Sequence, residues 1–126
     1  MAHQTQPNFI LLYVSSPAQS SIFFTRLLGL EPIEASPTFV MFALGSGVML
    51  GLWARHSVQP AADASASAAG ELAFAQPDKA AVDALHALWL SQGVAVIQPP
   101  CELDFGYAFT AEDPDGHRLR VFAPGG

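Results

Sequence analysis

Hydrophobic residues follow two spacings along this chain, and the spacings predict its secondary structure. Dense or alternating apolar residues indicate strands, which we expect at residues 8–15, 38–44, 48–54, 71–76, 94–98, 105–112 and 117–122, with a short extended piece at 31–34. Helical spacing predicts helices over residues 17–28 and 78–92, each with a proline near its start and ending before Gly29 or Gly93. The residues expected on the buried helix faces are Ile22, Phe23, Leu27, Val82, Leu85, Leu88 and Trp89.

The order of these elements repeats, since each half of the chain reads β-α-β-β-β. The first module is expected at residues 1–58 and the second at 70–126, joined by an Ala/Ser-rich linker at 59–69. We therefore predict an α+β fold of one structural domain. Its two βαβββ modules would form a curved, mixed eight-stranded sheet with outer helices and a concave cavity.

The closing hairpin contains the sequence Asp113-Pro114-Asp115-Gly116, whose residue types suit a type I turn. If the turn pairs Glu112 with His117, one face of the hairpin is aliphatic. The other face then carries aromatic residues and arginine, which suits a ligand better than a core. That face would hold Phe105, Tyr107, Phe109, Arg118, Arg120 and Phe122.

Composition excludes several classes of function. The net charge of −6 argues against binding to nucleic acid, because phosphates require a basic surface. A single cysteine, Cys101, is typical of a reducing compartment. The first residues lack a secretory signal, and no apolar run reaches the roughly 18 residues of a membrane span. We expect a cytoplasmic protein that does not bind membranes.

Two motifs together resemble the vicinal-oxygen-chelate superfamily, which includes glyoxalase I, extradiol dioxygenases and bleomycin resistance proteins. The first is Val14-Ser15-Ser16 followed by Ser20, Phe23, Phe24 and Leu28-Gly29-Leu30, and the second is the Asp-Pro-Asp-Gly turn. The resemblance spans nearly the whole chain. It implies paired βαβββ modules assembled as a homodimer, with the modules exchanged between chains.

Enzymes of that superfamily bind a divalent metal through four strand residues. Carried over by position, these fall on Phe9, Gly51, Glu71 and Arg120, of which only Glu71 can bind a metal. We therefore expect no metal, no cofactor and no catalytic residue. Arg120 either pairs with Glu71 as a structural ion pair or contacts a ligand, and the first reading is preferred. The four histidines show no metal-ligand spacing.

The same four positions indicate which side chains line the cavity. The candidate ligand-binding residues are Trp53, Tyr107, Phe105, Phe42, Met49, Gly51, Arg55, Tyr13 and Arg120. For strand 38–44 the register stays open: a two-residue turn directs Val40 and Phe42 inward, whereas a three-residue loop directs Phe39 and Met41 inward. Trp53 is either the main stacking platform or plain packing in a dimer interface.

Aromatic faces bind planar π-systems by stacking, and arginine can grip a carboxylate. Within the superfamily, the segments LLYVSS, VMLGLW and GYAFTAEDPDGH look most like small proteins that sequester phenazine antibiotics. The resemblance implies metal-independent sequestration of a planar aromatic compound, with phenazines as the specific candidate. One alternative is a metal-dependent lyase, isomerase or dioxygenase using His56, Glu71 and Glu102. Another is a regulatory or interaction module.

Overall fold

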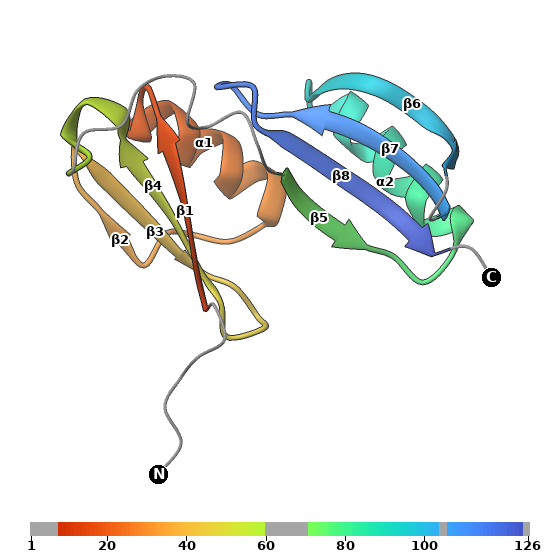
Figure 1. The fold of residues 1–126 in the computed structure, drawn as a ribbon, viewed down its shortest axis with the longest axis horizontal. Helices are drawn as coiled ribbons and strands as arrows, with labels where there is room; N and C mark the ends of the chain where they lie inside the picture. The colour runs from red at the N-terminus through yellow and green to blue at the C-terminus, as the bar shows by residue number, and fades with distance from the viewer. Residues whose placement is uncertain (1–7, 60–70, 104–105, 125–126) are drawn as a thin grey trace, which may run out of the picture. The chain divides into compact units, whose positions relative to one another are not determined.

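The structure is a computed structural model that describes residues 8–59, 71–103 and 106–124. The chain divides into two compact units, residues 1–67 and 68–126, which we call the first and second modules (Figure 1). Residues 60–69 of the predicted linker lie outside the described residues. Each module is described by itself below.

In the first module a helix packs on a four-stranded mixed sheet. The strands lie in the order β1-β4-β3-β2, with β1 parallel to β4 and the other pairs antiparallel. The elements are β1 (Phe9–Val14), α1 (Pro17–Leu28), β2 (Glu34–Ala35), β3 (Phe39–Ala43), β4 (Met49–Ala54) and the 3-10 turn η1 (Arg55–Ser57).

The second module repeats this plan. Its sheet has the order β5-β8-β7-β6, and β5 is parallel to β8. The elements are β5 (Glu71–Ala75), α2 (Lys79–Ser91), β6 (Ala95–Leu103), β7 (Gly106–Glu112) and β8 (Arg118–Pro124). The predicted α+β class and the two βαβββ modules are confirmed, and the eight strands of the described residues are hydrogen-bonded as two four-stranded sheets.

The helix ends follow the signals in the sequence. The Ser16 side chain accepts a hydrogen bond from the Gln19 amide at 3.2 Å, and Gly29 ends α1 with φ 68°. Asp78 caps α2 in the same way, accepting from the Ala81 amide at 2.8 Å. Neither described helix is long and apolar enough to cross a membrane.

The buried faces of the helices are narrower than predicted. The buried residues are Pro17, Ser20 and Phe24 in α1 and Val82 and Trp89 in α2. Ile22 is 63% exposed and Leu88 is 50% exposed, so their expected burial is wrong. Each residue turns a helix by about 100°, which carries these two side chains off the stripe that meets the sheet.

The closing hairpin is shifted by one residue from the predicted register. Asp113, rather than Glu112, pairs with His117 through a 3.0 Å backbone hydrogen bond. The type I turn is present, because the Gly116 amide donates to the Asp113 carbonyl at 3.0 Å. Gly116 then adds a residue with φ 84°, which makes a three-residue loop. A shift of one residue exchanges the two faces of a strand.

The strand after α2 is longer than predicted. The predicted strand ends at Gln98, before Pro99 and Pro100, but β6 continues through both prolines to Leu103. Its pairing with β7 shifts between Gln98 and Cys101, so the prolines lie in a bulge of an edge strand. Proline is tolerated there because it need not donate a ladder hydrogen bond.

Candidate functional site

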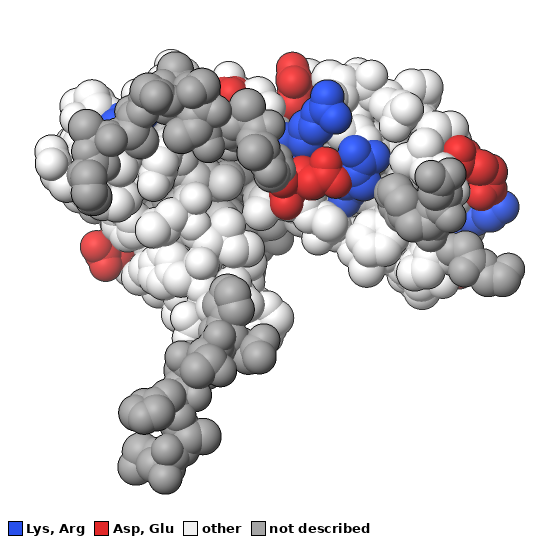
Figure 2. All heavy atoms as spheres, in the orientation of Figure 1, with Lys and Arg blue, Asp and Glu red and all other residues white. Residues whose placement is uncertain are grey.

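Each sheet has one face covered by its own helix and one face turned away from it, which we call the open face. On the open face of the first module, β1, β4 and β3 contribute three rows of residues. By register they are Phe9, Met49 and Ala43; Leu11, Gly51 and Met41; and Tyr13, Trp53 and Phe39. None of these nine residues is charged, but Glu34 of β2 continues the middle row beside Met41. Three of the four aromatic rings, those of Tyr13, Trp53 and Phe39, share one row. Figure 2 shows few charged atoms on this module, at the left of the view.

A pocket of about 430 Å³ lies on this open face and is lined by Phe9, Leu11, Phe39 and Trp53. We call it the aromatic groove. Phe9 is 42% exposed and Leu11 is 44% exposed, so both offer apolar surface to a ligand. The Tyr13 ring stands edge-on to the Trp53 ring, with centroids 6.4 Å apart, and packs against it from the side.

Gly51 lies beneath the groove and is required there by close packing. A Cβ at this position would lie 2.7 Å from Leu11 Cδ2 and 2.9 Å from Phe39 Cζ. The two side chains therefore rest on the bare backbone of Gly51. Gly51 was predicted as a ligand-binding residue, and Leu11 and Phe39 occupy the space above its backbone.

The register of β3, which the sequence left open, is the three-residue one. Leu44 and Val48 are joined by a backbone hydrogen bond of 2.9 Å, which leaves Gly45, Ser46 and Gly47 as the loop. Phe39 and Met41 are therefore on the open face. Phe42 lies opposite buried Leu50 with no exposed surface, so its predicted place in the cavity is wrong.

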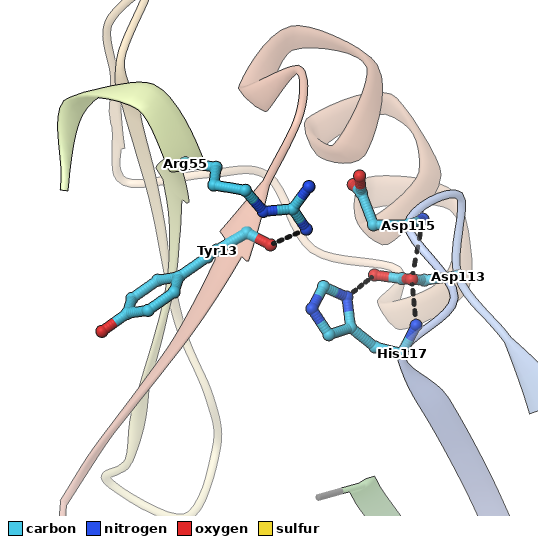
Figure 3. Close-up of polar contacts among 5 residues, drawn as sticks. All are labelled: Tyr13, Arg55, Asp113, Asp115 and His117. Carbon is cyan, nitrogen blue, oxygen red and sulfur yellow. Dashed lines mark hydrogen bonds and ion pairs between the residues drawn. The ribbon is translucent and has the colours of Figure 1, made fainter. Parts of the chain in front are cut away.

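Two other candidates from the first module, Met49 and Arg55, are not among the residues that line the groove. Met49 shares a row with Phe9 and is half-buried. Arg55 does not continue β4 but begins η1, and its guanidinium donates to the Tyr13 carbonyl at 3.5 Å (Figure 3). Phe105 lies outside the described residues.

The open face of the second module has two rows that carry polar residues and one apolar row, which contains Phe122. Arg120 and Glu71 form a two-pronged ion pair, with Nε–Oε1 at 2.5 Å and Nη2–Oε2 at 3.1 Å. The hydrogen bonds from Arg120 hold the pKa of Glu71 below its ordinary value, against the opposing effect of burial. The same contact raises the pKa of Arg120. The predicted structural ion pair is confirmed.

The shifted hairpin register moves two predicted cavity residues to the helix side. Phe109 is fully buried, and its ring contacts Trp89 and His86 of α2 with centroids 5.4 Å and 5.1 Å away. Tyr107 donates a 2.7 Å hydrogen bond to Asp83 of α2, which raises the pKa of the phenol. Its placement on the cavity side was wrong, because Tyr107 and Phe109 share a face with Ala123 and Val121.

Asp113 and His117 form a buried pair at the closing turn, shown in Figure 3. The Asp113 carboxylate accepts from the amides of Asp115 and His117 at 3.0 Å and 2.8 Å. It also lies 2.7 Å from His117 Nδ1. The pair resembles half of a catalytic triad, but these contacts all serve to hold the turn.

The positions carried over from metal-binding relatives do not form a donor set for a divalent metal. Phe9 and Gly51 offer no donor atom, and the carboxylate of Glu71 is bound to Arg120. Glu102, proposed in the enzyme alternative, pairs with Lys79 at 2.5 Å. Within the described segments no three His, Cys, Asp or Glu residues cluster as metal ligands would.

A second pocket of about 180 Å³ lies on the open face of the second module, which sequence reasoning did not identify. It is lined by Ile97, Gln98, Thr110, Arg118 and Arg120, and we call it the arginine pocket. Gln98, Thr110 and Arg120 share one row across β6, β7 and β8. The observed register of β7 and β8, which differs by one residue from the predicted one, brings Thr110 onto the face that carries the two arginines.

The chain is similar to proteins of known family along nearly its whole length. Residues 6–121 match the model of the Glyoxalase/Bleomycin resistance protein/Dioxygenase superfamily. A curated relative, the phenazine antibiotic resistance protein EhpR of Enterobacter agglomerans, is 30% identical over 118 residues, or 91% of this chain and 89% of the relative.

Solved structures match at the level of the fold. Protein ATC0852 from Agrobacterium tumefaciens is 49% identical, with a TM-score of 0.87 over 98% of this chain and all of that one. A lactoylglutathione lyase from Agrobacterium tumefaciens has a TM-score of 0.75 at 22% identity, over 97% of this chain and 96% of that one. A glyoxalase-related enzyme from Fulvimarina pelagi scores 0.81 at 21% identity, over 94% and 88%. These last two likenesses concern the fold alone.

Proposed function

The chain belongs to the glyoxalase/bleomycin resistance protein/dioxygenase superfamily, and we propose that within it this protein binds and sequesters a planar aromatic molecule without a metal. The aromatic groove carries the proposal. Its walls are apolar, Phe9 and Leu11 are 42% and 44% exposed, and Trp53 presents the largest ring on the open face. Stacking on such a ring contributes about 0.5–1.5 kcal/mol beyond the burial of surface.

A phenazine-like antibiotic is the specific ligand that we propose. The relative EhpR is named for phenazine resistance, and the likeness covers most of both chains. A three-ring planar compound suits a groove of about 430 Å³, since ligand pockets commonly measure about 300–1,000 Å³. The protein would act in the cytoplasm by lowering the free concentration of the compound.

The superfamily also contains enzymes, so the fold does not exclude catalysis. That this protein binds its ligand without reacting with it is part of the proposal. The argument against a metal-dependent reaction is the donor set, because Arg120 holds the carboxylate of Glu71. We further propose a homodimer with exchanged modules, which light scattering on the purified protein would test.

The function is tested by equilibrium dialysis with phenazine-1-carboxylate, whose own absorbance reports the bound fraction. Dialysis is preferable to a measurement of tryptophan fluorescence quenching, because the Trp53→Ala variant lacks one of the fluorophores. We expect micromolar, saturable binding that chelator does not change and that Trp53→Ala weakens about tenfold or more, which corresponds to roughly 1.4 kcal/mol.

A matched pair of variants controls this experiment. Leu11→Ala and Ile22→Ala each truncate an exposed aliphatic side chain of the first module, and only Leu11 lines the groove. Binding should weaken in the first variant and stay unchanged in the second. Equal loss in both, or stoichiometric zinc, iron or manganese needed for binding or turnover, would contradict the proposal.

A further inference from the structure

The arginine pocket is lined by polar groups, and the first of them is the Thr110 hydroxyl. Thr110 is 2% exposed, and its hydroxyl oxygen has no hydrogen-bond partner among the described residues. Buried hydroxyl groups nearly always have a partner, so an orphaned one in the lining of a polar pocket indicates a place for a ligand atom or a water. Gln98, in the same row, adds an amide group to the lining.

Arg118 supplies a positive charge that no carboxylate of the described residues neutralises by direct contact. Glu71 and Glu112 occupy its register positions on the two neighbouring strands, yet neither forms an ion pair with it. The Arg118 side chain instead lines the pocket, together with Arg120. Arg120 is already engaged by Glu71, which leaves Arg118 as the available cation.

We propose that the arginine pocket binds a carboxylate group, held by the Arg118 guanidinium with Thr110 and Gln98 as neutral partners. The planar guanidinium matches a carboxylate in two parallel hydrogen bonds. A singly charged group also fits the surroundings better than sulfate or phosphate, because Glu71 and Glu112 flank Arg118 and would repel a doubly charged anion. The inference concerns the second module and does not depend on the aromatic groove.

The test is a ¹⁵N NMR titration of the full chain with benzoate, compared with benzamide and with sulfate at matched ionic strength. We expect benzoate to shift the signals of the Thr110 amide and the Arg118 side chain saturably, with benzamide and sulfate at least tenfold weaker. Equal responses to benzoate and benzamide would overturn the proposal, because the charge would then not be recognised.

Two variants separate a site from a general charge effect. Arg118→Gln should weaken benzoate binding about tenfold or more, whereas Lys79→Gln, which removes the same charge elsewhere in the second module, should change it less than twofold. Thr110→Val should weaken binding while the protein stays as stable as the wild type, since its hydroxyl has no internal partner to lose. Equal effects of Arg118→Gln and Lys79→Gln would refute the site.

The source of the carboxylate is distinguished by further arms of the titration. Acetate tests a free small carboxylate, and phenazine-1-carboxylate against phenazine-1-carboxamide tests a carboxylate on an aromatic ligand. If neither phenazine binds but benzoate and acetate still shift Thr110 and Arg118, the proposed function fails and the carboxylate site stands. If both phenazines bind equally well and no carboxylate shifts these two signals, the proposed function stands and the carboxylate site fails.

Discussion

The two modules share one plan of helix and strands, but their open faces differ in chemistry. On β1, β4 and β3 of the first module nine residues in three rows carry no charge, and the aromatic groove lies among them. The equivalent strands of the second module carry Glu71, Glu112, Arg118 and Arg120. Figure 2 shows the charged atoms gathered mainly on that second module. The same backbone thus presents an apolar surface in one module and a polar one in the other.

The difference shows how a repeated fold separates scaffold from function. The helix-facing sides of both sheets are alike, with buried aliphatic and aromatic residues such as Leu50, Phe42, Val121 and Phe109. These residues exclude water from each module and stabilise it. The residues of the open faces do not have to form the core, so their chemistry can differ between the two modules.

The largest effect should come from truncating the core side of the first module. Phe42→Ala removes a fully buried ring and should cost about 3–5 kcal/mol of unfolding free energy. Trp53→Ala, on the open face of the same module, should cost roughly 1 kcal/mol. Urea denaturation measures both. Comparable losses would mean that the open face is also part of the folding core.

A second substitution tests the close packing beneath the aromatic groove. Gly51→Ala would press on the tips of Leu11 and Phe39, which can move into the groove because they are side-chain ends. We expect binding of phenazine-1-carboxylate to weaken about tenfold while stability changes by less than about 1 kcal/mol.

The matched control for Gly51 is Gly45→Ala. A Cβ at Gly45 meets nothing within 4 Å, so neither binding nor stability should change. Dialysis and urea denaturation of both variants provide the measurement. Unchanged binding in Gly51→Ala would show that Leu11 and Phe39 do not shape the site.

The smallest effect concerns the ion pair of the second module. Because Arg120 lowers the pKa of Glu71, their pairing stabilises the protein above the ordinary carboxyl value near 4.5 and is lost as the pH falls through the lowered value. Glu71→Gln should therefore cost about 0.5–1 kcal/mol at pH 7, a difference that shrinks below pH 4.5.

Glu102→Gln is the control for this ion pair. Its pair with Lys79 is highly exposed, with side-chain exposures of 61% and 66%, and should contribute almost nothing at any pH. Thermal unfolding across pH 3–7 distinguishes the two variants. A pH-independent loss in Glu71→Gln would assign its effect to packing rather than to charge.

Much of the fold could be predicted from local signals. Ser16 and Gly29 mark the ends of α1, and the repeated β-α-β-β-β order marks the two modules. The candidate site was predicted less well. Trp53, Gly51 and the Glu71–Arg120 pair are where the pattern placed them, whereas Phe42 and Tyr107 are on the opposite faces of their strands.

The sequence by itself determined the elements, their order and the residue types available to the open faces, because capping, turn chemistry and hydrophobic spacing act over a few residues. Only the tertiary structure decided which alternate residues of β3 and β7 face outward. One loop residue more or fewer exchanges the two faces of a strand, and the closing hairpin has a loop of three residues, with Gly116 at positive φ, where the predicted pairing required four. The strand register therefore placed Phe39 in the groove and Thr110 beside the arginines.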